Sequence, residues 1–262
     1  MRVLFIQQDH MSPTGPVGEA FADHGFDVQE FMVVPEEHFH EPSVAVAFPG
    51  PLAFDAIVSM GAAWSVYDHD RIGSWVGDEL DFLRRAYHAG VPVLGICFGG
   101  QALAAALGGM VVRAERPEIG WTTVETSRPD LIEPGPWFQW HADRWVLPDG
   151  VRALARTEAA EQAFTAGRSM GVQFHPELTP QMLDGWLDNV GRHHAIAMGA
   201  EPERLIEETA ARSAEAEARA RRLVTAFLAL GEPRSSRSAN QRDRVTRIGS
   251  KCEHGRDATS AD

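Results

Sequence analysis

The fold of this chain is decided by one stretch, Val93-Leu94-Gly95-Ile96-Cys97-Phe98-Gly99-Gly100-Gln101-Ala102-Leu103. An apolar run passes through a Gly-Xaa-Cys-Xaa-Gly turn into an Ala- and Leu-rich run, which predicts a buried strand followed directly by a helix. Glycines on both sides of Cys97 remove side chains where strand and helix meet, so the thiol projects from the turn. The helix N-terminus favours a thiolate, and the N–H of Phe98 is left free to donate to an oxyanion. By itself, the pattern fits a small buried cysteine as well as a nucleophile.

Short apolar runs recur towards the N-terminus, separated by segments compatible with helices: Val3–Ile6, Val28–Val34, Ala56–Met60 and Val91–Ile96. This alternation predicts an α/β fold with a mostly parallel central sheet flanked by helices. Apolar residues also recur at helical spacing up to Gly90, so we expect one helix over Arg71–Ala89. The cysteine turn therefore lies at the carboxyl end of this sheet.

Beyond the cysteine turn, the pattern changes to short strand-like pieces with turn residues between them. We expect the sheet to continue there with antiparallel strands, over residues 120–126, 137–140, 144–147 and 170–174. Thr179 and Pro180 are typical of the N-cap and first position of a helix, which closes the domain.

The last part of the chain differs in composition from the α/β domain, which we assign to residues 1–198. Residues 199–231 are rich in Ala, Glu and Arg with spaced apolar positions, which predicts a helical extension. Residues 232–262 contain almost no large apolar side chains and are expected to be a disordered tail.

The overall charge argues against a nucleic-acid partner. The formal net charge is -13, whereas binding a phosphate backbone requires clustered Lys and Arg. No apolar segment is long enough to span a membrane or to serve as a secretion signal. The two cysteines, Cys97 and Cys252, have neither disulfide-rich nor metal-type spacing. We therefore expect a cytoplasmic protein without membrane association or a metal site.

A second motif supplies the partners that a cysteine nucleophile needs. The segment Gly171-Val172-Gln173-Phe174-His175-Pro176-Glu177 ends an apolar strand with a histidine and, two residues later, a carboxylate. A thiolate needs an imidazole to move the proton and a third group to orient the ring. Cys97, His175 and Glu177 therefore make a chemically complete catalytic triad.

Together the two motifs resemble those of the class I, or triad type, glutamine amidotransferases, and in particular the GMP synthetase branch. The likeness extends over Met1–Asn189. It implies the flavodoxin-like fold of that family, glutamine as substrate, and hydrolysis of the side-chain amide through a cysteine thioester to glutamate and ammonia. Such a reaction requires no metal or organic cofactor.

The resemblance also assigns backbone donors to an oxyanion hole. The family usually has Gly-Gly-Pro in the loop after the third strand, where this chain has Gly61-Ala62-Ala63. This implies that the N–H of Ala62 joins that of Phe98 in the oxyanion hole. Both alanines depart from the family pattern, although a backbone donor does not depend on its side chain.

Substrate-binding positions follow from the same resemblance, and they are Gly61, Gln101, His141, Ala142 and Asp143. Gln101 stands four residues after the nucleophile, and residues 140–143 resemble the Ser-His-Gly-Asp segment of the GMP synthetase branch. For His141 and Asp143, the alternative is a hydrogen bond that only holds a loop.

Ammonia made by such a domain is usually passed to a synthetase. The sequence contains neither the Ser-Gly-Gly-Xaa-Asp-Ser loop of an ATP pyrophosphatase nor a Gly-Xaa-Xaa-Xaa-Xaa-Gly-Lys phosphate loop. The motifs therefore fit a subunit that supplies a separate synthetase, and they fit a stand-alone amidase equally well. The alternatives are a stand-alone hydrolase of γ-glutamyl peptides and amides, or a noncatalytic binding module with the same fold. The related peptidase branch has His directly after the cysteine, where this chain has Phe98.

Overall fold

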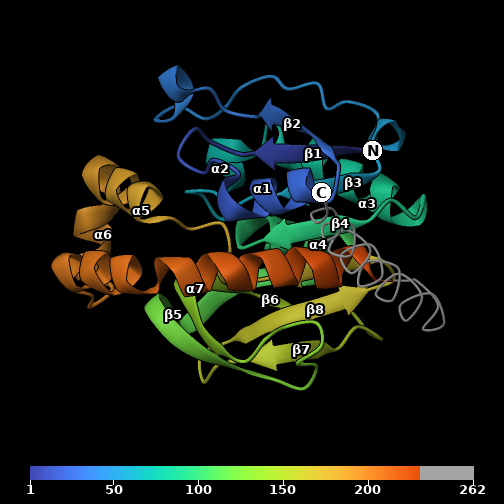
Figure 1. Ribbon diagram of the computed structural model, residues 1–262. Helices are drawn as coiled ribbons and strands as arrows, with labels where there is room; N and C mark the ends of the chain where they lie inside the picture. The colour runs from blue at the N-terminus through green and yellow to red at the C-terminus, as the bar shows by residue number, and fades with distance from the viewer. Residues whose placement is uncertain (231–262) are drawn as a thin grey trace, which may run out of the picture. The chain divides into compact units, whose positions relative to one another are not determined.

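A nine-stranded sheet runs through the described part of the chain, residues 1–230, in the order β2-β1-β3-β4-β9-β8-β7-β5-β6 (Figure 1). In this computed structural model, Met1–Leu228 form one compact unit. The expected disordered tail, residues 232–262, lies outside the described residues, and so does Cys252 within it.

The sheet has two halves with different strand directions. Parallel pairing joins β1 (Arg2–Gln7), β2 (Asp27–Met32), β3 (Ala56–Ser59), β4 (Val93–Ile96) and β9 (Ser169–Val172). Antiparallel pairing continues the sheet through β8 (Glu161–Ala166), β7 (Ala153–Arg156), β5 (Met110–Thr126) and β6 (Gly135–Val146). The parallel half has the strand order of flavodoxin-like folds. The predicted α/β fold and its antiparallel continuation are both confirmed.

Helices cover both faces of the parallel half (Figure 1). The helix α1 (Gly15–Asp23) packs against α7 (Pro202–Leu228), and α3 (Val76–His88) packs against α4 (Phe98–Ala106). The shorter helical segments are η1 (Glu36–His38), η2 (Pro51–Ala53), α2 (His69–Ile72), α5 (Pro180–Trp186), η3 (Leu187–Gly191) and α6 (Arg192–Ala197). Thr179 caps α5 as predicted, because its Oγ1 accepts a hydrogen bond from the N–H of Met182 at 3.2 Å.

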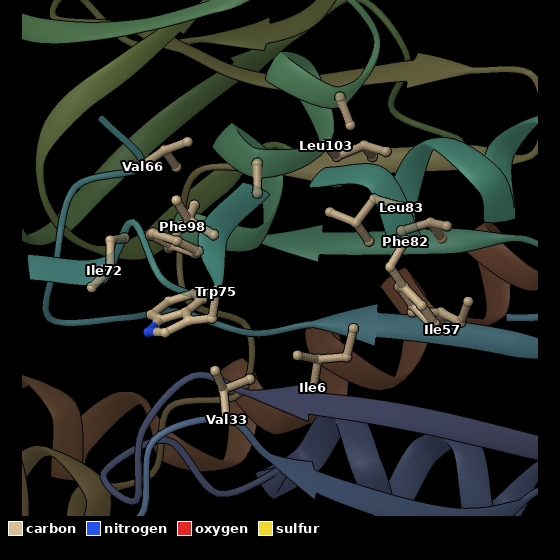
Figure 2. Packing of buried hydrophobic residues seen from close by; sticks show 14 of the residues in the cluster. Ile6, Val33, Ile57, Val66, Ile72, Trp75, Phe82, Leu83, Phe98 and Leu103 are labelled. Carbon is tan, nitrogen blue, oxygen red and sulfur yellow. The ribbon is translucent and has the colours of Figure 1, made fainter. Parts of the chain in front are cut away.

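The alternation of side chains along β1 gives each face its own core. Phe5 packs edge-on against Phe21 of α1, and Phe21 packs against Phe227 of α7, at centroid distances of 5.7 Å and 6.1 Å. On the other face, Figure 2 shows a buried cluster of strand and helix side chains that includes Ile6, Ile57, Phe82, Leu83, Phe98 and Leu103. Each such side chain contributes about 1.5–3 kcal/mol by leaving water, so the start of α4 is held firmly on the sheet.

The expected helix over Arg71–Ala89 is wrong in one respect, because the structure divides it into α2 and α3. Trp75 between them has a non-helical φ of -137°, and its indole N–H donates to the carbonyl of Pro42 at 2.9 Å. This tertiary contact outweighs the local helical pattern and breaks the helix at Trp75.

The expected break between residues 140 and 144 is also wrong, since β6 continues through this segment. His141 and Asp143 pair with Glu118 and Arg113 of β5. Pairing with a long neighbouring strand satisfies the backbone here, so these residues form part of a rigid strand and not of a loop.

The C-terminal helix α7 lies where the helical extension is expected. It packs against α1, α5 and β5, and the indole N–H of Trp121 donates to Oγ1 of Thr209 at 2.9 Å. The boundary at residue 198 between domain and extension stays a prediction. Among the described residues, no helix combines the length and apolar character needed to cross a membrane.

Candidate active site

Cys97 occupies a strained turn between β4 and α4. Its φ is +49°, the one left-handed value among the described residues other than glycine, and its N–H donates to the carbonyl of Val172 on β9 at 2.8 Å. Gly99 lies so close to β3 that a Cβ there would approach the carbonyl oxygen of Ser59 to 2.0 Å. Backbone strain of this kind persists only where the surroundings hold it, and it projects the thiol from the carboxyl end of the sheet.

His175 follows β9 and lies beside the nucleophile. Its Nδ1 donates to Oε1 of Glu177 at 2.8 Å, while its Nε2 has no hydrogen-bond partner. Burial opposes the charged imidazolium, but the nearby Glu177 carboxylate and Cys97 sulfur outweigh it and raise the pKa of His175 well above its usual value. Glu177 is fully buried, so the ring has a fixed orientation.

Two groups flank the Cys97 sulfur. Nε2 of Gln173 lies 3.6 Å from Sγ, and the carbonyl oxygen of Trp140 lies 3.9 Å from it on the β6 side. Gln173 also accepts a hydrogen bond from Nε2 of Gln101 at 3.2 Å, which links the sulfur to α4. An amide N–H directed at sulfur stabilises a thiolate, since anionic acceptors form the stronger hydrogen bonds.

The loop after β3 faces the same site. A Cβ at Gly61 would lie 3.2 Å from Cε1 of His175, so a larger residue would press on the imidazole. Among the described backbone hydrogen bonds, none uses the N–H of Ala62, while that of Ala63 donates to Oδ2 of buried Asp9 at 3.2 Å. The carboxylate of Asp9 also accepts from Met11 at 2.9 Å, and its burial raises its pKa. Asp9 thus ties the loop to the end of β1.

The remaining sequence-predicted residues form one connected wall. Nε2 of Gln101 donates to the carbonyl of Asp143 at 3.3 Å, and Nδ1 of His141 lies 2.9 Å from the same oxygen. Nε2 of His141 faces Glu118 at 3.1 Å. The Asp143 carboxylate accepts from the hydroxyls of Ser65 and Tyr67. These side chains all make hydrogen bonds within the protein, and their role in substrate binding stays a prediction.

Most of these groups line a cavity of about 220 Å³. Nine of the ten sequence-predicted site residues line it: Gly61, Ala62, Cys97, Phe98, Gln101, His141, Ala142, Asp143 and His175. The tenth, Glu177, lies behind His175. No three His, Cys, Asp or Glu side chains of residues 1–230 gather as a cation-binding cluster. The cavity can therefore position a carboxamide-sized group against a thiol, an imidazole and backbone N–H donors.

Comparison with known protein families matches residues 24–189, more than half of the chain, to the family described as glutamine amidotransferase class-I. The chain belongs to the class I glutamine amidotransferases. Its strand order and its cysteine turn agree with that membership, and the resemblance inferred from the sequence is confirmed.

Similar proteins include glutamine-hydrolysing GMP synthases. Over 37% of this chain, the sequence is 42% identical to the GMP synthase of Aquifex aeolicus. Over 58% of this chain, it is 35% identical to the GMP synthase of Thermus thermophilus. The matched segments are 21% and 31% of those proteins, so the chain spans between a fifth and a third of their length.

Solved structures share the fold of this amidotransferase. A glutamine amidotransferase from Thermotoga maritima aligns over 87% of this chain and 97% of its own, with a TM-score of 0.74 and 23% identity. A glutamine amidotransferase from Methylobacillus flagellatus aligns over 87% and 94%, also with a TM-score of 0.74, at 22% identity.

Among the residues at the amidotransferase site that escaped the sequence-based predictions, three have functional contacts: Asp9, Arg113 and Gln173. Asp9 and Arg113 carry no local motif, because each reaches the cavity only through the pairing of distant strands. Gln173 stands two residues before His175 within the second motif, and that proximity was the signal that could have identified it.

Proposed function

We propose that this amidotransferase hydrolyses the side-chain amide of glutamine to glutamate and ammonia. The observation that carries the proposal is that Cys97 and His175 line one cavity, with Glu177 hydrogen-bonded to His175, in a class I glutamine amidotransferase. Cys97 acts as nucleophile, His175 moves the proton, and Glu177 orients the ring and stabilises its charge.

The reaction has two halves. The thiolate attacks the carboxamide carbon, and the N–H groups of Phe98 and Ala62 stabilise the oxyanion. Protonated His175 gives its proton to the leaving nitrogen, which departs as ammonia and leaves a γ-glutamyl thioester on Cys97. His175 then takes a proton from water, and the water oxygen attacks the thioester. Glutamate is released and the thiolate of Cys97 is regenerated.

The similar GMP synthases suggest the fate of the ammonia. We propose that an amination partner, such as a synthetase, receives ammonia from this site, because the similar proteins are named glutamine-hydrolysing GMP synthases. Hydrolysis of γ-glutamyl peptides or amides is the second candidate. Arg113, an exposed cation at the cavity, favours it.

The test is the release of glutamate and ammonia from glutamine by purified protein. We expect wild type and Cys252→Ala to be active, and Cys97→Ala to lose at least about 10⁴-fold in kcat. Cys252→Ala is the matched control because it removes the other cysteine of the chain. Equal activity of Cys97→Ala and wild type contradicts the proposal, as does the absence of both turnover and Cys97 alkylation by a glutamine diazoketone.

A further inference from the structure

One arginine faces the candidate active site from the antiparallel half of the sheet. Arg113 on β5 pairs with Asp143 on β6 and lines the cavity that contains Cys97. It is the single Lys or Arg among the described lining residues. The register of the β5–β6 pair shifts directly after Arg113, and irregularities of this kind re-aim side chains beside functional sites.

The guanidinium of Arg113 lies near a carboxylate without using its hydrogen-bond donors. Nη1 lies 3.6 Å from Oδ1 of Asp143, an ion-pair distance longer than a hydrogen bond. Asp143 accepts instead from the hydroxyls of Ser65 and Tyr67. Within the described residues, no hydrogen bond from the Arg113 side chain is formed, and 67% of that side chain is exposed. Its planar set of N–H donors is therefore available to a ligand.

The position of Arg113 relative to the nucleophile follows from two contacts. The carbonyl of Trp140 lies 3.9 Å from Sγ of Cys97, and three residues along β6 the carbonyl of Asp143 accepts from Gln101 on α4. Arg113 is the β5 partner of that same Asp143. A substrate with its amide carbon at Cys97 can therefore extend along β6 towards the guanidinium.

The charges around Arg113 make it a fixed cation of the cavity. Burial and the positive charge of Arg113 lower the pKa of His194, so His194 is neutral at neutral pH. The Asp9 carboxylate faces two backbone N–H groups, and that of Asp143 faces two hydroxyls and Arg113. The other cation of the cavity, the His175 imidazolium, lies at the nucleophile, so away from the nucleophile the guanidinium with its free donors favours a carboxylate ligand.

We propose that Arg113 binds a carboxylate of the substrate, and that the substrate is a γ-glutamyl compound recognised through it. This inference rests on the proposed function. The carboxylate has two possible sources: the α-carboxylate of the γ-glutamyl group, or the carboxylate of an amino acid joined to the leaving nitrogen. Arg113 determines binding in either case, while Cys97 and His175 carry the chemistry.

The test measures binding, so it does not depend on turnover. In a Cys97→Ala background, calorimetry gives the Kd of two ligand pairs: glutamine with its α-carboxamide analogue, and γ-glutamylglycine with γ-glutamylglycinamide. Arg113→Gln removes the charge. Arg116→Gln is the matched control, since Arg116 lies on the same strand, its side chain is 68% exposed and it does not line this cavity.

We expect Arg113→Gln to weaken binding of the carboxylate-bearing member of one pair by about 10-fold or more and to leave its amide partner unchanged. If the two members differ only in the glutamine pair, Arg113 binds the α-carboxylate, and both γ-glutamylglycine compounds are then weakened alike because both keep that group. If the two members differ only in the γ-glutamylglycine pair, Arg113 binds the leaving-group carboxylate. Equal loss for both members of each pair, no loss at all, or no binding of any of the four compounds overturns the inference. Turnover of glutamine by wild type is measured in parallel. If Arg113→Gln has no selective effect but wild type hydrolyses glutamine, the inference about Arg113 fails while the proposed function stands.

Discussion

The two halves of the sheet contribute different things to the candidate site. In the parallel half, β3, β4 and β9 are buried at every residue, and the strand ends carry Gly61, Cys97 and His175. In the antiparallel half, β5 is partly exposed over 17 residues and β6 runs for 12, and together they form the wall beyond the nucleophile. Short buried strands fix reacting groups with little freedom, whereas a long partly exposed strand pair can vary its side chains without disturbing them.

The contrast is clearest in two carboxylate–histidine pairs. His175 and Glu177 lie at the end of the parallel half, 2.8 Å apart, and His141 and Glu118 lie in the antiparallel half, 3.1 Å apart. Both pairs are almost fully inaccessible to solvent. Yet one imidazole keeps a free Nε2 beside Cys97, while the other uses both ring nitrogens on protein oxygens. The parallel half is therefore expected to set kcat and the antiparallel half to set KM.

The largest effect that separates the halves is expected from Glu177→Gln. We expect kcat to fall about 10²- to 10³-fold, because the imidazolium loses its stabilising charge. Glu177 raises the pKa of His175 against the effect of burial, so its loss lowers that pKa. In the variant, His175 therefore loses at lower pH the proton that it must give to the leaving nitrogen. The alkaline limb of the kcat/KM profile moves to lower pH as a result.

Glu118→Gln is the control for that variant, since it alters the corresponding pair of the other half. It is expected to change KM while kcat stays within about threefold of wild type. If both variants lower kcat equally, the proposed division between the two halves is wrong.

A smaller effect concerns the stability of the parallel half, where Glu79 of α3 is fully buried. It accepts hydrogen bonds from Ser59 and Gln8 beneath the cysteine turn, and burial raises its pKa from 4.5 to about 7. The folded protein thus binds this proton more tightly than the unfolded chain. The contribution of Glu79 to stability is therefore greatest below about pH 4.5 and falls as the pH rises to about 7, by up to about 3 kcal/mol.

Glu79→Gln is expected to remove that slope, as measured by urea unfolding between pH 4.5 and 8. Asp78→Asn, at the exposed neighbouring position on α3, serves as control and is expected to keep it. Equal slopes in the two variants mean that the Glu79 carboxyl does not hold its proton in the folded state.

The smallest effect is expected in the loop that joins the reacting groups to the wall. Asp9→Ala leaves the N–H of Ala63 without its acceptor, so the neighbouring N–H of Ala62 is less well oriented. We expect kcat to fall about 10-fold with little change in KM. Ala63→Pro, which restores the proline of the family pattern, removes that N–H. In the Ala63→Pro background, Asp9→Ala is expected to lower kcat much less than in wild type. If the two effects on kcat are fully additive in this double-mutant cycle, Asp9 does not anchor the loop through Ala63.

Sequence reasoning reached the features set by neighbouring residues more completely than those set by distant contacts, for a physical reason. The turn around Cys97 and the segment from Gly171 to Glu177 are local patterns, in which neighbouring residues determine strand, turn and helix. The break at Trp75 depends on the distant carbonyl of Pro42, and the continuous β6 strand depends on β5. Asp9 and Arg113 likewise reach the site through strand pairing, which no local pattern records.

The central claim is that Cys97 is the nucleophile of this amidotransferase. The most direct measurement treats wild-type protein with a glutamine diazoketone and locates the adduct by peptide mass spectrometry, while glutamine hydrolysis is followed in the same samples. We predict one adduct per chain, on Cys97 and not on Cys252, with activity lost in proportion to labelling. Full labelling of Cys97 with undiminished hydrolysis, or loss of activity with the adduct on another residue, would contradict the account.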